Sequence, residues 1–153
     1  MHIDVEPIGT VRGGRGQPVD DHWGDVEAVI ELDARRLAGD ATAGLEDFSH
    51  IEVVYVFHLV DADDVHTGAR HPRGRRDWPL VGILAQRAKA RPNRIGVSVC
   101  ELLAVDGLTL RVRGLDAIDG TPVLDVKPYV QAFAPRSAVR EPPWVSELTR
   151  DYF

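Results

Sequence analysis

A stretch of sixteen residues, Gly114–Tyr129, holds most of the side chains that could do acid–base chemistry. It contains three aspartates, a lysine and a tyrosine, namely Asp116, Asp119, Asp125, Lys127 and Tyr129. Gly120 and Pro122 favour turns, which would keep these side chains within a short reach. A carboxylate there could accept a proton, while the ammonium and phenol orient a substrate or stabilise charge. From the residues alone, turn-forming aspartates and a surface lysine are an equally good interpretation.

Further polar side chains stand where apolar runs end. His58 follows the run Ile51–Phe57, while Arg87, Arg91 and Asn93 follow the run that starts at Val81. If the ends of neighbouring strands converge, these side chains meet the acidic stretch and form one polar site. An arginine in such a site can bind a carboxylate with two parallel hydrogen bonds.

Several reaction classes lack their motif in this sequence. There is no Gly-x-Gly-x-x-Gly, no phosphate-binding loop, no Gly-x-Ser-x-Gly and no Cys-x-x-Cys. The six histidines show no His-x-x-x-His spacing on a predicted helix, and Cys100 is the single cysteine. We therefore expect no metal site, and we interpret Cys100 as a core residue in a reducing compartment.

Charge is distributed unevenly along the chain. The net charge is −6, yet Gly68–Arg94 carries eight basic residues against the one acid Asp77. Such a segment is either a solvated face or a site for an anion such as RNA phosphate. The 153 residues suffice for one domain, and no apolar run approaches the about 20 residues that span a bilayer. With no signal-peptide pattern at Met1, we expect a cytoplasmic protein without a membrane segment.

The elements that must position these residues are predicted to be short strands. Alternation is clearest in Leu103–Arg113, where we expect a hairpin with a type I′ turn at Asp106-Gly107, with Leu108, Leu110 and Val112 facing inward. The other predicted strands are rich in β-branched or aromatic residues: Val5–Val11, Val26–Leu32, Ile51–Leu59, Val81–Gln86 and Gly96–Leu103.

Helix signals are weak and local, at Asp33–Leu37, Ala43–Phe48 and Pro143–Tyr152. Without helices between strands, the strands must bury their apolar faces against one another, so the sequence predicts a mainly β protein, a small and mostly antiparallel barrel. Residues 1–135 form this barrel domain and residues 136–153 a tail with a short helix. The loops Val11–Gly24 and Asp61–Pro79, the second rich in arginine, are long enough to carry function.

Three motifs resemble the signatures of the TsaA-like family. They are Gly44–His50, Arg87 together with Arg91–Ser98, and Asp119–Tyr129, and the likeness covers about residues 4–133. Characterised members are S-adenosylmethionine-dependent methyltransferases that methylate the exocyclic nitrogen of threonylcarbamoyl-adenosine at position 37 of tRNA. The resemblance implies an antiparallel barrel that acts as a homodimer, with S-adenosylmethionine near the subunit boundary.

The resemblance also implies roles for individual residues. The cofactor would be bound by His58, Arg87 and the segment Leu115, Asp116, Ala117 and Ile118, and the substrate by Arg91 and Asn93. Asp119 and Asp125 are the candidate bases, with Lys127 and Tyr129 as orienting or charge-stabilising groups. The chain departs from the family in the loop Gly14–Gly24, at Leu59 and at Arg94.

Two other functions fit the same residues. The acidic remainder of the chain and the altered first loop would suit a methyltransferase acting on a small molecule, and a non-catalytic module that binds the cofactor or RNA is the third hypothesis. Of the tryptophans, Trp78 adjoins the Arg-rich loop and is the candidate for stacking on a base.

Overall fold

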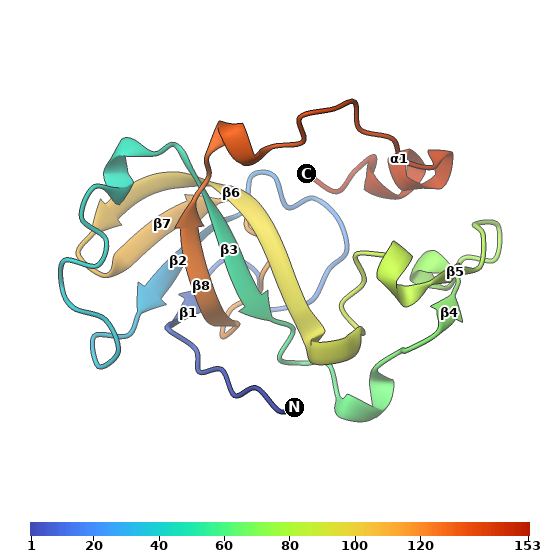
Figure 1. Cartoon of the computed structure of the whole chain (residues 1–153), viewed down its shortest axis with the longest axis horizontal. Helices are drawn as coiled ribbons and strands as arrows, with labels where there is room; N and C mark the ends of the chain where they lie inside the picture. The colour runs from blue at the N-terminus through green and yellow to red at the C-terminus, as the bar shows by residue number, and fades with distance from the viewer.

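Six strands close into an antiparallel barrel. The computed structural model describes residues 1–153. The strands follow one another around the barrel in the order β1-β2-β7-β6-β3-β8 (Figure 1). Their bounds are β1 Gly9–Arg12, β2 Glu27–Leu32, β3 His50–Val56, β6 Ile95–Asp106, β7 Thr109–Arg113 and β8 Pro122–Pro128. The predicted mainly β barrel is confirmed.

Alternation along the strands builds the core. In β3 the residues Ile51, Val53 and Tyr55 are buried, while those between them face outward. They join a cluster of 13 buried residues that includes Leu110 and Val112, as the hairpin pattern predicted. Leu108, which was also expected to face inward, lies in the turn and is only half-buried. Each fully buried aliphatic side chain contributes about 1.5–3 kcal/mol. Cys100 also lies in this core, where burial raises the pKa of its thiol to about 12.

The predicted hairpin is formed by β6 and β7, but its turn is shifted by one residue. Asp106 pairs with Thr109, so the two loop residues are Gly107 and Leu108. Gly107 has a φ of 54° and Leu108 does not have a positive φ. This is the φ pattern of a type II′ turn, with glycine at its first position, and the expected type I′ turn is wrong.

Two of the other strand predictions need correction. β8 spans Pro122–Pro128, where the sequence indicated turns, and it closes the barrel between β1 and β3. The predicted strand Val81–Gln86 is not a barrel strand. It is the two-residue β5, Val81–Gly82, followed by a 3-10 turn at Ile83–Ala85.

Residues 61–94 project from the barrel as an Arg-rich lobe (Figure 1). The lobe contains β4, Ala69–Arg70, paired with β5, and four 3-10 turns: η2 Ala62–Asp64, η3 Pro72–Gly74, η4 Ile83–Ala85 and η5 Pro92–Arg94. The buried amide of Gln86 donates to the carbonyls of Arg70 and Val81, both at 3.0 Å, and so holds the two short strands together.

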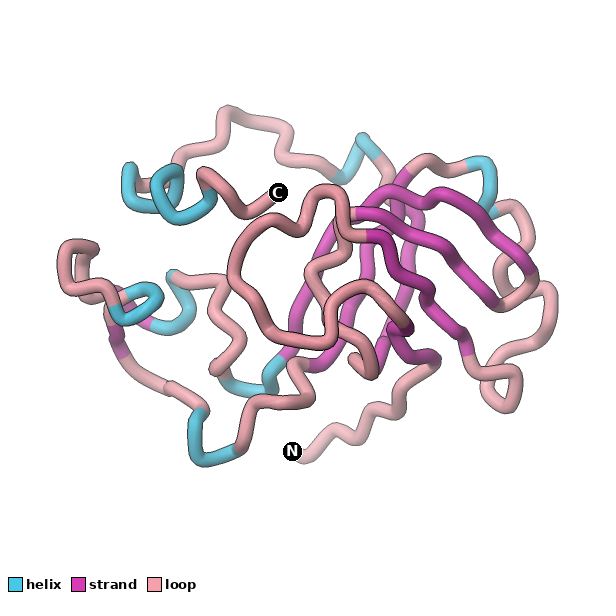
Figure 2. Tube along the Cα trace, turned by 180° about the vertical axis from the view of Figure 1, so that it is seen from behind, coloured by secondary structure: helices cyan, strands magenta, loops and turns pink.

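The remaining helices are short and lie at the periphery (Figure 2). They are η1 Leu45–Asp47, η6 Gln131–Phe133 and the single α-helix α1, Pro143–Thr149, with Pro143 in the predicted first-turn position. Asp33–Leu37 forms a hydrogen-bonded turn instead of the expected helix. None of these helices has the length and apolar character of a transmembrane segment.

Candidate active site

Asp116 is the centre of a hydrogen-bonded cluster at the point where β7 has ended. Its Oδ1 accepts from the hydroxyl of Tyr55 on β3, at 3.1 Å, and from that of Ser98 on β6. Its Oδ2 accepts from the hydroxyl of Tyr152, which follows α1. Three donors from distant parts of the chain therefore hold one carboxylate, and a fourth acceptor position stays available.

The two phenols of the cluster are held protonated. Burial, followed by the nearby charge of Asp116, raises the pKa of Tyr55 and that of Tyr152. The positive charge of Arg87 acts against this rise in both cases. Arg87 donates to the carbonyl of Val97 at 2.6 Å, and this uses one of its five N–H groups.

The neighbours of Asp116 in sequence are apolar and buried. Leu115 and Ala117 belong to the barrel core, and Ile118 is 9% exposed. Their side chains pack within the protein, so only their backbone groups could bind a ligand through hydrogen bonds. The donor set therefore fits S-adenosylmethionine. It offers a guanidinium for the carboxylate, an acidic acceptor for a hydroxyl or ammonium group and an apolar lining.

His58 lies at the glycine turn that precedes β8 and follows Asp119. Gly120 has a φ of 84°, and a Cβ added there would lie 3.7 Å from Nε2 of His58. The Oδ1 of Asp119 accepts from the backbone N–H of Gly13 at 2.8 Å, while its own N–H donates to the carbonyl of Arg15. Asp119 thus fixes the first long loop, besides being a candidate base.

Asp125 and Lys127 lie on the outer face of β8, where the structure pairs them. Lys127 donates to Oδ2 of Asp125, whose Oδ1 accepts from the N–H of Val126 at 2.9 Å. The hydrogen bond that Lys127 donates to Asp125 raises the pKa of Lys127. Both side chains are about half exposed, 45% and 59%. Tyr129 follows them at 37% exposure, and its N–H donates to the carbonyl of His50.

The two predicted substrate-binding residues lie on the loop that leads into β6. Arg91 donates to the carbonyl of Gln86 at 2.7 Å and so braces the loop. Asn93 and Arg94 are consecutive residues with positive φ, 64° and 53°. Such a conformation is costly for residues other than glycine and is held here by the surrounding contacts, including one from Arg94 to the carbonyl of Val60.

The structure thus brings the predicted residues together in pairs. Arg87 is linked to Asp116 through neighbouring residues, because Arg87 donates to the carbonyl of Val97 and the hydroxyl of Ser98 donates to Asp116. His58 lies at the turn of Gly120, which follows Asp119 in sequence, and Lys127 donates to Asp125. The first pair adjoins Ser98, which faces the barrel interior, whereas the third lies on the outer face.

Sequence reasoning missed the three donors to Asp116, which are Tyr55, Ser98 and Tyr152. Ser98 stands in the motif that resembles the family, but its inward position beside Tyr55 depends on the pairing of β3 with β6. Gly96 is part of the same arrangement, because a Cβ there would lie 2.5 Å from the ring of Tyr55. No sequence signal identifies Tyr152, which is 36 residues from Asp116.

Trp78 is a packing residue, as isolated tryptophans usually are, and is not placed to stack on a base. Its side chain is 4% exposed, its Nε1 donates to Glu147 of α1 at 2.8 Å, and the guanidinium of Arg75 covers its ring. Trp23 is likewise buried, at 3%. Both indoles pack within the protein and offer no face to a base.

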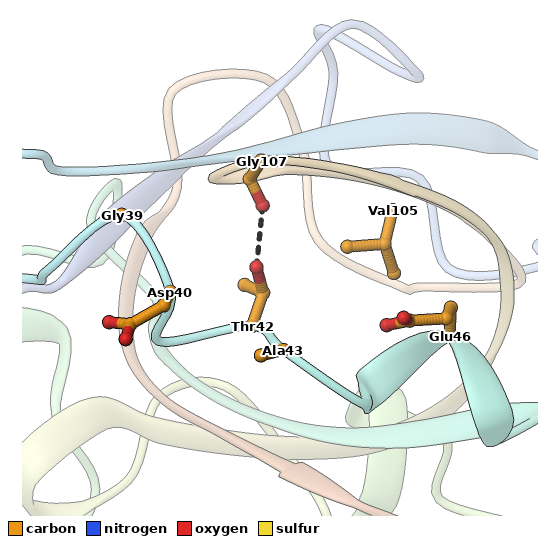
Figure 3. Close-up of a pocket in the computed structure, with 7 residues that line it drawn as sticks. All are labelled: Gly39, Asp40, Thr42, Ala43, Glu46, Val105 and Gly107. Carbon is orange, nitrogen blue, oxygen red and sulfur yellow. Dashed lines mark hydrogen bonds between the residues drawn. The ribbon is translucent and has the colours of Figure 1, made fainter.

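A separate hollow of about 290 Å³ lies at the β6–β7 turn (Figure 3). The hydroxyl of Thr42 crosses it to the carbonyl of Gly107 at 2.7 Å and fastens the preceding loop to the hairpin. Asp40 and Glu46 are its only charged residues, and none of the predicted site residues lines it. Nor does the structure contain a group of three or more His, Cys, Asp or Glu side chains placed to hold a metal ion.

The sequence of this chain matches a known family. The model of the tRNA-methyltransferase O N-terminal domain matches residues 15–134. The chain belongs to this family.

Related proteins agree with this assignment. A probable S-adenosyl-L-methionine-binding protein of Methanothermobacter thermautotrophicus is 40% identical over 135 residues, 86% of this chain and 93% of the relative. The tRNA (adenine(37)-N6)-methyltransferase of Escherichia coli is 41% identical over 95 residues, 60% of this chain and 40% of the enzyme.

The fold also matches a solved structure. The crystal structure of TrmO from Pseudomonas aeruginosa superposes with a TM-score of 0.75 and 29% identity, covering 94% of this chain and 62% of that one. The chain therefore spans nearly all of its archaeal relative but less than two thirds of the TrmO chain.

Proposed function

We propose that the chain is an S-adenosylmethionine-dependent methyltransferase that methylates threonylcarbamoyl-adenosine at position 37 of tRNA. The observation that supports this best is the Asp116 cluster beside Arg87, in a chain whose relatives are named for S-adenosylmethionine binding and for tRNA (adenine(37)-N6) methylation. The cytoplasm, where tRNA is modified, is the proposed location.

Arg87 and Asp116 are proposed to hold the cofactor, which supplies an activated methyl group on its sulfonium. The remaining N–H groups of Arg87 suit its carboxylate, and the free acceptor position of Asp116 suits a ribose hydroxyl or the amino group. The buried side chains of Leu115, Ala117 and Ile118 exclude water beside these groups. His58 would approach from the turn at Gly120.

Asp125 is the proposed proton acceptor, with Asp119 as the alternative. An exocyclic nitrogen that carries a carbamoyl group is a poor nucleophile, so removal of its proton contributes to the rate. Lys127 keeps its charge because Asp125 raises its pKa, and it can stabilise negative charge on the substrate. Arg91, Asn93 and Tyr129 are proposed to orient the nucleoside.

We also propose that two copies pair through the outer face of β3 and β6. Ile95, Val97 and Val99 are 38%, 37% and 41% exposed, and Val56 and Val54 lie opposite the first two across the strand pair. A sheet face in contact with water is normally polar, so a contiguous aliphatic face indicates a covering partner. Asp125 adjoins this face through its pairing with Val54, so a second copy would enclose it. Sedimentation that shows only monomers at micromolar concentration would contradict this pairing.

The Arg-rich lobe is the proposed contact for tRNA phosphates. Arg70, Arg76 and Lys89 have no acidic partner, whereas Arg73 and Arg75 are paired with Asp21 and Asp77. Free cations bind phosphate and make affinity dependent on salt.

Methyl transfer from labelled S-adenosylmethionine tests the function. The acceptors are tRNA that carries threonylcarbamoyl-adenosine and the same tRNA without the modification. We expect label only in the first, and a loss of about a hundredfold in Asp125→Asn and Lys127→Ala. Asp40→Asn, in the hollow of Figure 3, is the matched control and should keep full activity. Absence of transfer to either RNA would overturn the tRNA assignment, and absence of cofactor binding would overturn the function.

A further inference from the structure

The residues that follow α1 fold back onto the first long loop. The N–H of His22 donates to the carbonyl of Asp151, and that of Trp23 donates to the carbonyl of Tyr152, both at 2.8 Å. A Cβ at Gly24 would lie 2.8 Å from the backbone carbon of Phe153, so glycine permits this close approach. Figure 1 shows the end of the chain between α1 and the barrel.

The same segment is tied to the Arg-rich lobe. Glu147 on α1 accepts from the indole N–H of Trp78 at 2.8 Å. The lobe in turn contacts the first loop, because Arg73 donates to both oxygens of Asp21 at 3.0 and 2.8 Å. Residues 143–153 therefore have fixed contacts with the lobe, with the loop and, through Tyr152, with the barrel.

Tyr152 supplies the only hydrogen bond from the protein to Oδ2 of Asp116. The other oxygen, Oδ1, already has two donors, Tyr55 and Ser98. A carboxylate with donors on both oxygens is fixed in rotation, whereas one held through a single oxygen can turn about its Cβ–Cγ bond. The orientation of Asp116 relative to Arg87 thus depends on a residue far away in sequence.

We propose that residues 143–153 complete the cofactor site, with Tyr152 as the positioning residue that orients the Asp116 carboxylate. This inference rests on the proposed binding of S-adenosylmethionine by Asp116. It extends the site from the barrel to a segment outside the matched residues 15–134. Tyr152 acts through Asp116 and has no acid–base role in the transfer.

Titration of the full chain with S-adenosylmethionine in a calorimeter tests the proposal. Tyr152→Phe removes the hydroxyl and keeps the ring, and we expect the dissociation constant to rise about tenfold, the effect of losing one hydrogen bond to a charged group. In methylation assays the KM for the cofactor should rise with little change in kcat. Thr149→Val is the matched control, because the Thr149 hydroxyl donates only to the carbonyl of Val145 within α1.

A double variant separates positioning from general damage to the fold. In an Asp116→Asn background, Tyr152→Phe should have no further effect on cofactor affinity, because both changes act on the same group. Equal affinity of the unaltered chain and Tyr152→Phe overturns this inference and leaves the proposed function intact, as does a full additional loss in the double variant. If the unaltered chain binds no cofactor, the proposed function and this inference both fail.

Discussion

The barrel and the Arg-rich lobe of residues 61–94 are stabilised by different kinds of interaction. The barrel encloses 13 buried residues in one cluster, and its six strands form a continuous antiparallel ladder. The lobe has two strands of two residues each and four buried side chains, Pro72, Trp78, Ile83 and Gln86. Burial of apolar surface therefore stabilises the barrel, whereas single polar contacts carry much of the lobe.

Those polar contacts join side chains to backbone carbonyls. Gln86 donates to Arg70 and Val81, and Arg91 donates to Gln86. Removal of one such donor side chain leaves a single backbone carbonyl without its hydrogen bond. A change in the barrel core instead affects the packing of many neighbouring side chains at once. Regions with few buried apolar contacts open at lower free energy than the core. The lobe should therefore open independently of the barrel.

The largest effect is expected from Leu110→Ala. Leu110 is fully buried in the barrel cluster, and truncation of such a side chain costs about 2–5 kcal/mol from lost burial and the cavity left behind. Urea unfolding followed by tryptophan fluorescence measures the free energy of unfolding. Leu84→Ala is the matched control in the lobe, since Leu84 is 80% exposed and should change stability by less than about 0.5 kcal/mol. Equal losses for both variants would contradict the contrast between the two regions.

A smaller and local effect is expected from Gln86→Ala. Its loss leaves two carbonyls without their donor, at a cost of about 1–3 kcal/mol that falls on the lobe. Hydrogen exchange should become faster in residues 61–94 and stay unchanged in β3 and β6. Gln131→Ala, on the exposed turn η6, is the control with the same change of side chain. Faster exchange throughout the barrel would show that the two regions unfold together.

The barrel was predictable from the sequence because alternation reports burial on one face. β2, β3, β6 and β7 all follow this pattern. The strand β8 was not predicted, because its outer face carries Asp125 and Lys127 and because prolines stand at both of its ends. The pairing with β1 and β3 overrides these local signals. In the lobe, the apolar run at Val81 suggested a strand of the barrel, but its residues lie in the small lobe outside the barrel.

The candidate site was predictable only in part, because some of its contacts also depend on how distant parts of the chain pair. Motifs identified Arg87 and Asp116, which stand in or near the stretches that resemble the family. Tyr55 and Tyr152 were not identified, because their contact with Asp116 joins residues 61 and 36 positions away. Such contacts arise from strand register and from the path of the chain after α1, and neither is encoded in local spacing.

The smallest expected effect concerns the ion pair between the first loop and the lobe. Asp21 and Arg73 are 29% and 25% exposed at their side chains, with oxygen and nitrogen 2.8 Å apart. The hydrogen bond from Arg73 lowers the pKa of Asp21 below its usual 3.8. A carboxyl with a lower pKa in the folded state adds stability that is fully present above the unfolded value and is lost as the pH falls through the folded value.

Asp21→Asn should therefore destabilise the chain near neutral pH by about 0.2–1 kcal/mol, and this difference should shrink as the pH falls below 3.8. Urea unfolding of both proteins at pH 7, 5 and 3 measures it, with Asp64→Asn as a control that has no ion pair in the lobe. A difference that stays constant down to pH 3 would mean that the side chain contributes by packing and not by its charge. In the expected case, the ion pair between Asp21 and Arg73 joins the lobe to the first loop, which residues 143–153 also contact. Acid should then weaken the contact between lobe and loop, while the barrel core keeps its apolar contacts.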